Sequence, residues 1–232
     1  MAKKHAYYDN TSMIDEAIRT LRTNLSFSSI DKQLKKIVIT SSHPSEGKST
    51  IALKLARSMV KNHQKVLLVD CDLRNPSVGK IMGTQFNLGL TNLLVKGLEF
   101  DQVKMKDSEE SDLDIILTGP TPPNPSELLG SERMKRLLEK LETIYDVIIL
   151  DTPPAGILTD AQVLSTMADG VLLVVAQGET KYEEIDVTLQ NLKHVGANVL
   201  GTVLNKVEVK NKHKYGYGYG YGYGYKYGSS QS

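Results

Sequence analysis

The sequence contains a single cysteine, no tryptophan, no excess of charge of one sign and no long apolar run. Cys71 cannot form a disulfide within the chain, and no apolar signal core follows the N-terminal residues, so we expect a protein kept in a reducing cytoplasm. The 28 Lys and Arg against 27 Asp and Glu give a net charge of +1, which supplies no field to bind nucleic acid. The longest apolar run, Val171–Ala176, is too short to span a membrane, which takes about 20 residues. Any membrane contact must come through a partner.

The composition of the 232 residues, 40% hydrophobic and 24% charged, excludes disorder over most of the chain and suits one globular domain. Short runs of β-branched residues and leucine predict strands buried on both faces of a sheet: Ile37–Thr40, Val66–Asp70, Ile115–Leu117, Val147–Asp151, Val171–Ala176 and Val199–Asn205. Apolar residues three or four apart predict helices between several of these runs. The alternation indicates an α/β fold, with a mainly parallel sheet and helices on both faces.

An added N-terminal helix is predicted within residues 1–35. Thr11 and Ser12 are suited to cap it, with Asp15 and Glu16 in its first turn. Its apolar stripe would consist of Ile14, Ala17 or Ile18, Leu21 and Leu25. We therefore expect this helix to pack on the main domain through one face.

The main domain is predicted to extend over residues 36–205, followed by a tail over residues 206–232. Four prolines between residues 119 and 126 exclude helix and central strand there, so we expect an ordered loop or a lid. In the tail the apolar pattern stops, and we expect disorder in a segment rich in Tyr and Gly. Its tyrosines alternate with single residues: Tyr215, Tyr217, Tyr219, Tyr221, Tyr223, Tyr225 and Tyr227.

The segment SHPSEGKST, residues 42–50, follows the first predicted strand and leads straight into a helix, which is the context of a phosphate-binding loop. A glycine lets backbone amides close on phosphate oxygens, a lysine is a point charge between the β- and γ-phosphates, and a serine hydroxyl can bind Mg²⁺. The candidate nucleotide-binding residues are Ser45, Glu46, Gly47, Lys48, Ser49 and Thr50. Ser42 stands where the usual pattern has its first glycine, and the alternative is an ordinary strand-to-helix turn.

Two acidic motifs end buried strands at the edge where ligands bind in open α/β sheets. In the first, Asp70 and Asp72 flank Cys71, which we interpret as a small core residue. In the second, Asp151 opens an Asp-Thr-Pro-Pro segment and has the Walker B position, where a carboxylate holds Mg²⁺ or its water. Three buried carboxylates beside a phosphate loop need a cation. The alternative is that Asp70 and Asp72 merely cap the next turn.

Together with the loop Pro122–Leu129 and the tail tyrosines, these motifs make the chain similar to the stand-alone bacterial tyrosine kinases of capsule and exopolysaccharide operons. The resemblance covers nearly the whole chain. It implies a P-loop NTPase fold and an autophosphorylating protein-tyrosine kinase that uses ATP and Mg²⁺ and regulates polysaccharide synthesis or export.

The resemblance also implies roles for single residues. Lys48, Ser49 and Thr50 would bind nucleotide and Mg²⁺, Asp72 and Asp151 would hold the metal directly or through water, and Asp70 would accept or orient the tyrosine hydroxyl. Which of Asp70 and Asp72 is the base stays open. A guanidinium suits two uses, so Arg74 either neutralises the transferred phosphate or pairs with a carboxylate. Related folds place an adenine-contacting side chain near Asn205.

An assembly is implied as well. Glu16, Arg19 and Arg22 match the Glu-x-x-Arg-x-x-Arg motif by which this family joins subunits into a homo-oligomeric ring, although alone they would indicate a solvated helix face. The seven tail tyrosines would then be phosphoacceptors in trans. The family further implies an activator, the cytoplasmic tail of a membrane-bound chain-length regulator, which would recruit the kinase to the inner face of the membrane, and a cognate tyrosine phosphatase.

Two other functions fit parts of the sequence. A switch ATPase of the cell-division or plasmid-partition type shares the sheet and the three motifs, but it carries an extra lysine near the start of the phosphate loop, where this chain has His43. An inactive ATP-binding adaptor is not favoured by a complete set of Lys48, Asp70, Asp72 and Asp151. The sequence therefore favours the kinase.

Overall fold

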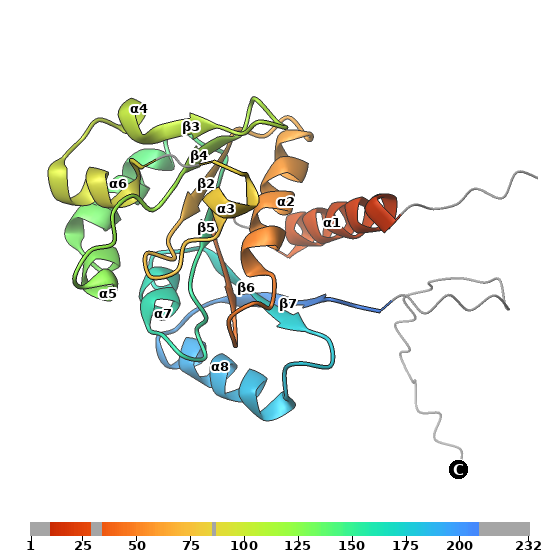
Figure 1. The fold of residues 1–232 in the computed structure, drawn as a ribbon. Coiled ribbons are helices and arrows are strands. Elements are labelled where there is room, and N and C mark those ends of the chain that lie inside the picture. The colour runs from red at the N-terminus through yellow and green to blue at the C-terminus, as the bar shows by residue number, and fades with distance from the viewer. Residues whose placement is uncertain (1–9, 29–33, 85–86, 209–232) are drawn as a thin grey trace, which may run out of the picture.

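A computed structural model of the chain describes residues 10–28, 34–84 and 87–208 (Figure 1). The seven tail tyrosines and the predicted disorder of the tail lie outside these ranges. Within them, no helix has both the length and the apolar character needed to cross a membrane.

The strands are β1 (Lys36–Ser41), β2 (Val66–Asp70), β3 (Lys104–Lys106), β4 (Asp114–Ile116), β5 (Val147–Asp151), β6 (Gly170–Ala176) and β7 (Val199–Asn205). The helices are α1 (Asn10–Phe27), α2 (Lys48–Val60), α3 (Val78–Ile81), α4 (Phe100–Val103), α5 (Pro125–Leu129), α6 (Glu132–Leu141), α7 (Asp160–Ser165) and α8 (Tyr182–His194), with one π-helical turn, η1 (Asn92–Lys96).

The seven strands form one sheet in the order β3-β4-β2-β5-β1-β6-β7. All neighbours are parallel except β3 and β4, which run antiparallel. The six predicted strands are confirmed to within a residue or two at their ends, and so is the mainly parallel sheet. The edge strand β3 was not predicted, because Lys-Met-Lys carries no apolar run. β1 lies between β5 and β6, so the loop that follows it opens at the carboxyl edge of the sheet, close to the end of β5.

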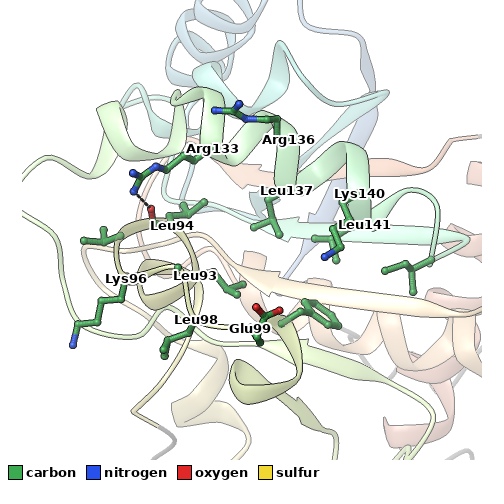
Figure 2. Close-up of a pocket in the computed structure, with 14 residues that line it drawn as sticks. Leu93, Leu94, Lys96, Leu98, Glu99, Arg133, Arg136, Leu137, Lys140 and Leu141 are labelled. Atoms are coloured by element: carbon green, nitrogen blue, oxygen red, sulfur yellow. Dashed lines mark hydrogen bonds between the residues drawn. The ribbon is translucent and has the colours of Figure 1, made fainter.

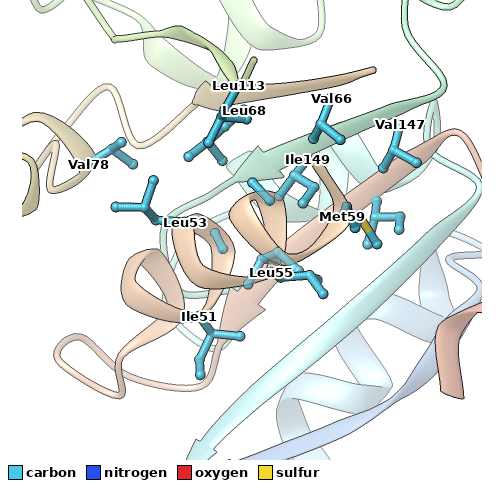
Figure 3. Close-up of a cluster of buried hydrophobic side chains, with 14 of the residues drawn as sticks. Ile51, Leu53, Leu55, Met59, Val66, Leu68, Val78, Leu113, Val147 and Ile149 are labelled. Carbon is cyan, nitrogen blue, oxygen red and sulfur yellow. The ribbon is translucent and has the colours of Figure 1, made fainter. Parts of the chain in front are cut away.

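Helices cover both faces of the sheet (Figure 1), as expected: α1 and α2 pack on one face, and η1, α6, α7 and α8 on the other. The side chains of β1 alternate accordingly, with Ile37 and Ile39 facing α2 and Val38 facing the opposite core. Figure 3 shows Leu53 and Leu55 of α2 within the first core, between the helix and the strands. Burying each such side chain stabilises the folded state by about 1.5–3 kcal/mol. This packing fixes the start of α2, and hence the phosphate loop, relative to the sheet.

The predicted cap of the N-terminal helix is wrong. α1 already includes Asn10, so Thr11 and Ser12 lie inside the helix and the acidic pair Asp15 and Glu16 falls in its second turn. The stripe is confirmed toward its C-terminal end, where Ile18 and Leu25 are buried in the core, while Ile14 is 46% exposed.

The predicted loop over residues 119–126 is two residues too long at its end. α5 begins at Pro125, because proline is tolerated in the first turn of a helix, where its missing N–H would have no partner. The segment from Gly119 to Asn124 is the loop. It leads from β4 to α5 at the carboxyl edge of the sheet.

Candidate active site

The phosphate loop owes its shape to two residues with left-handed backbone. Gly47 has a φ of +92° and Ser45 a φ of +64°. A Cβ atom at Gly47 would lie 2.1 Å from Nδ2 of Asn205, so only glycine fits this position. The next residue, Lys48, is the first of α2, whose N-terminal amides have no partner within the helix. Such a helix start is suited to bind phosphate.

Glu46 and Asn205, both predicted to contact nucleotide, hold the phosphate loop in place. The buried Glu46 carboxylate accepts hydrogen bonds from the backbone N–H of His43, at 2.8 Å, and from the hydroxyl of Thr180. The Asn205 amide donates to the carbonyl of Glu46 at 2.8 Å. The Glu46 side chain is therefore engaged within the protein, and any contact of this residue with phosphate would be through its backbone.

The structure brings the predicted lysine and the three aspartates together. Lys48 Nζ lies 3.2 Å from Oδ2 of Asp72, and both side chains are almost fully buried. Asp70 and Asp151 are register partners at the ends of β2 and β5. The carboxylate of Asp70 accepts hydrogen bonds from the N–H groups of Asp72, at 3.1 Å, and Val78, at 3.2 Å. Without a bound metal, the positive charge beside these buried carboxylates comes from the ammonium group of Lys48.

Burial of these carboxylates alters their acidity. Burial, together with the negative charge of Asp151, raises the pKa of Asp70 above its usual range. Burial also raises the pKa of Asp151, although the positive charge of Lys48 acts against it. Asp70 thus lies in a setting where a carboxyl group can hold a proton near neutral pH.

Asp151 is suited to a metal ion. Both of its carboxylate oxygens are buried, and neither accepts a hydrogen bond of ordinary geometry from the described residues, although the nearby Ser49 hydroxyl acts to lower the pKa of Asp151. This setting fits Mg²⁺ or a water bound to it. No three His, Cys, Asp or Glu side chains in the described ranges are grouped so as to hold a metal by themselves. Mg²⁺ here would also need hydroxyl, water or phosphate oxygens, as this ion commonly does.

A cleft of about 450 Å³ opens above these residues. It is bounded by the phosphate loop, the segment after β2 and the segment after β5, and its lining includes Lys48, Ser49, Thr50, Asp72 and Arg74. These five side chains place two basic, two hydroxyl and one acidic group at the carboxyl edge of the sheet, which is the chemistry that binds a nucleoside triphosphate with its metal.

Comparisons with known proteins agree with this site. Residues 34–203 match a family model described as an AAA domain. Over 194 residues the chain is 41% identical to the tyrosine-protein kinase YwqD of Bacillus subtilis, covering 84% of this chain and 81% of the relative. The kinase domain of the Escherichia coli tyrosine kinase ETK superposes with a TM-score of 0.81 at 35% identity, covering 88% of this chain and 80% of that chain. The chain belongs to the bacterial tyrosine-protein kinases.

The kinase also has the fold of a switch ATPase. The MinD cell division protein of Aquifex aeolicus superposes with a TM-score of 0.62 over 75% of this chain and 70% of that chain, at 22% identity. At that identity the likeness shows the P-loop NTPase fold alone. The resemblance to tyrosine kinases is confirmed, with a nucleotide-binding domain and protein-tyrosine kinase activity, and the ATPase alternative is weaker.

Arg74 of the kinase pairs with a carboxylate, one of its two predicted uses. Its Nε lies 3.3 Å from Oδ2 of Asp160, and its Nη2 donates to the hydroxyl of Ser126 at 3.1 Å. α5 and α7 are thereby linked to the rim of the cleft. The side chain of Arg74 is 38% exposed, so part of the guanidinium also faces solvent.

Three residues around the site escaped the sequence analysis. Asp160 is buried at the start of α7, Thr180 bonds to Glu46, and Thr188 donates to the hydroxyl of Ser42 at 3.0 Å. This last bond explains how a serine replaces the usual first glycine of the loop, because its side chain is buried against α8. A polar residue at a helix start could have indicated Asp160, but no local signal marks the two threonines.

The three residues of the predicted oligomerisation motif make different contacts in the structure. Glu16 and Arg19 form an ion pair of 2.6 Å on the exposed face of α1. Arg22 instead donates from Nη1 to the carbonyl of Ser58, at 2.5 Å, and to its hydroxyl, at 3.3 Å. Arg22 therefore holds α1 against α2 within one chain, whereas the side chains of Glu16 and Arg19 face solvent.

Proposed function

We propose that this kinase transfers the γ-phosphate of ATP to tyrosines of its own C-terminal cluster in a neighbouring subunit, and to tyrosines of other proteins, and so regulates capsular or extracellular polysaccharide synthesis. The observation that carries the proposal is the Lys48–Asp72 pair beside the buried carboxylate of Asp151, in a cleft next to Asp70. The tail supplies seven tyrosines in a single chain segment.

The residues divide the work as follows. Lys48 would leave Asp72 to bind the β- and γ-phosphates, and the backbone of residues 45–47 and the Thr50 hydroxyl would hold further phosphate oxygens. Ser49, Asp72 and Asp151 would hold Mg²⁺, which would supply positive charge beside the phosphates.

Asp70 is proposed as the base. Its raised pKa makes its carboxylate, once deprotonated, a stronger base than an ordinary aspartate, whereas Asp72 is committed to Lys48 and to the metal. Asp70 would take the proton of the tyrosine hydroxyl as its oxygen bonds to phosphorus and the bond to the ADP oxygen breaks. Arg74 at the rim would shift from Asp160 toward the transferred phosphate.

The kinase is proposed to work as a homo-oligomeric ring in the cytoplasm, recruited to the inner face of the cell membrane. The activator would be the cytoplasmic tail of a membrane-bound chain-length regulator, and a cognate tyrosine phosphatase would reverse the reaction. Family membership supports these partners, and the exposed Glu16–Arg19 pair supports a contact surface on α1.

The proposed ring contact can be tested on α1. We expect Glu16→Ala/Arg19→Ala to lower the fraction of oligomer measured by light scattering, while Arg22 is kept because it packs α1 onto α2. One exposed ion pair contributes only about 0–1 kcal/mol to the free energy of association, so the loss at each contact should be small. The losses at all contacts of a ring would add up to a measurable decrease in the fraction of oligomer. The matched control is Glu179→Ala/Lys206→Ala, another exposed ion pair, which should leave assembly unchanged. If the α1 variant assembles like its parent, the pair belongs to a solvated face.

Transfer in trans to the tail is the main test of the proposed function. A Lys48→Met chain with its full tail is mixed with an active chain that ends at Lys214, together with Mg·ATP and a peptide of the activator's tail. We expect label from the γ-phosphate on the Lys48→Met chain, located by mass spectrometry within residues 215–227. Absence of label there, while the full-length active kinase labels itself at a rate independent of its concentration, would show transfer in cis and refute the ring scheme.

A further inference from the structure

A second concave surface lies between α6 and the segment formed by η1 and α4 (Figure 2). Its volume is about 500 Å³, and none of the residues lining it lines the nucleotide cleft. The floor is apolar and is made by Leu93, Leu94, Leu98, Phe100, Leu137 and Leu141. We call this surface the α6 pocket.

Four cations surround this floor. Arg133, Arg136 and Lys140 come from α6 and Lys96 from η1, whereas Glu99 is the only acidic side chain among the lining residues (Figure 2). In the described part of the chain, none of the four cations has a carboxylate oxygen within 4 Å. This contrasts with Arg57, Lys61 and Lys106, each of which is paired with an acidic residue. The α6 pocket therefore carries positive charge that the chain itself does not neutralise.

Both arginines donate to backbone carbonyls. Arg133 donates from Nη1 to the carbonyl of Leu94 at 2.8 Å, which joins α6 to η1 and forms one wall. Arg136 donates from its Nε to the carbonyl of Glu132 at 3.2 Å, and its terminal nitrogens have no hydrogen-bond partner among the described residues. In Figure 2 its side chain points away from the leucines, so a change of rotamer would bring its guanidinium over the pocket. A guanidinium with free terminal nitrogens is suited to bind two oxygens of one phosphate.

The pocket thus fits a ligand with an aromatic or aliphatic body and a strongly negative end. Phosphotyrosine has this chemistry, since its ring is apolar and its phosphate carries about −1.5 to −2 charges at neutral pH. It is also the product of this kinase. We propose that the α6 pocket binds phosphotyrosine of the C-terminal tail, with the ring on the leucine floor and the phosphate on Arg136 and Lys140. The identity of the bound segment rests on the proposed function, in which the tail tyrosines are the acceptors.

The tail is long enough to reach this pocket. β7, from which the tail continues, is one edge of the sheet, and α4 runs directly into β3 at the opposite edge. Six strand spacings amount to about 29 Å. The 17 residues that follow Glu208, up to Tyr225, extend to at most about 60 Å, which is enough for the tail of the same chain. A tail bound there is removed from the nucleotide cleft, so the pocket separates product from active site.

Synthetic peptides test this directly. A fluorescent peptide of residues 214–228 with phosphotyrosine at position 225 is titrated with the full-length Lys48→Met chain, and binding is followed by anisotropy. We expect it to bind at least about tenfold more tightly than the unphosphorylated peptide. A peptide with phosphoserine at position 225 should bind more weakly than the phosphotyrosine peptide, because it has no ring to place on the leucine floor.

Variants locate the binding to the pocket. Arg136→Gln/Lys140→Gln should lower the affinity for the phosphotyrosine peptide about tenfold. Glu99→Gln should raise that affinity, because it removes the one negative charge among the lining residues. Lys135→Gln/Lys193→Gln removes the same charge from surfaces outside the pocket and should change binding little. Equal affinity in both double variants would overturn the proposal, as would preferential binding of vesicles containing phosphatidylglycerol, which would mark a membrane-facing surface.

The peptide experiment tests the α6 pocket independently of the proposed function, because the phosphotyrosine is made by chemical synthesis and not by the kinase. If the peptide binds the α6 pocket but the tail is not labelled in the mixing experiment, the acceptor role fails and the pocket stands as a phosphotyrosine site. If the tail is labelled but the peptide does not depend on Arg136 and Lys140, the pocket proposal alone fails.

Discussion

Lys48→Met is expected to reduce the rate of tyrosine phosphorylation by about a thousandfold, the size of effect seen when a preorganised group that stabilises transition-state charge is removed. Lys48 is the first residue of α2 and pairs with Asp72 at 3.2 Å, so its charge is placed between the Asp72 carboxylate and the phosphate loop. Methionine keeps a similar length and packs in the same channel. The rate of phosphate transfer at saturating Mg·ATP measures the effect.

A lysine further along the same helix provides the control. Lys54→Met removes a positive charge from α2 at a position that does not line the nucleotide cleft, and it should leave the rate within a few-fold of the parent. Circular dichroism should be the same for both variants. A Lys48→Met protein that retains activity at the level of Lys54→Met would mean that the cleft is wrongly assigned as the catalytic site.

Asp70→Asn is expected to lower the rate of transfer by roughly 10² to 10⁴, the usual contribution of a general base, with little change in nucleotide affinity. The reason is that Asp70 is held by the N–H groups of Asp72 and Val78 and does not line the cleft, whereas Asp72 does. Asp151→Asn, by contrast, should weaken the binding of Mg·ATP as well. Equal losses of nucleotide affinity in the two variants would contradict this division of roles.

The pH profile tests the same assignment. A base acts in its deprotonated form, so the rate in the parent kinase should rise with pH until it passes the raised pKa of Asp70 and then level off. Lowering the pH through that pKa protonates Asp70 and removes the activity. The residual activity of Asp70→Asn should lack this rise, and a rise that persists in the variant would assign the base to another group.

The sheet and the catalytic edge could be predicted because their signals are local. Strands such as Val147–Asp151 are continuous apolar runs that end in a carboxylate. The residue before Lys48 is a glycine, which is the residue type that a tight turn with positive φ requires. The pattern therefore placed Asp70 and Asp151 at one edge, where the structure has them as register partners.

The remaining parts depend on contacts between distant segments. Nothing near Asn205 in the sequence indicates that its amide binds the carbonyl of Glu46, 159 residues away. The motif Glu16, Arg19, Arg22 has regular spacing, yet Arg22 alone turns toward Ser58 of the next helix. The α6 pocket is likewise formed by η1 and α6, whose apolar residues separately indicate only packing against the sheet.

The close approach of Asn205 to Gly47 makes the base of the tail a structural part of the nucleotide loop. The last strand ends at Asn205, and Glu208 beyond it still donates to the side chain of Gln177. A deletion that removes Asn205 would leave the carbonyl of Glu46 without its donor and open a gap behind the glycine. An intact nucleotide loop therefore requires the chain through the last residue of β7, and not only the segment around Lys48.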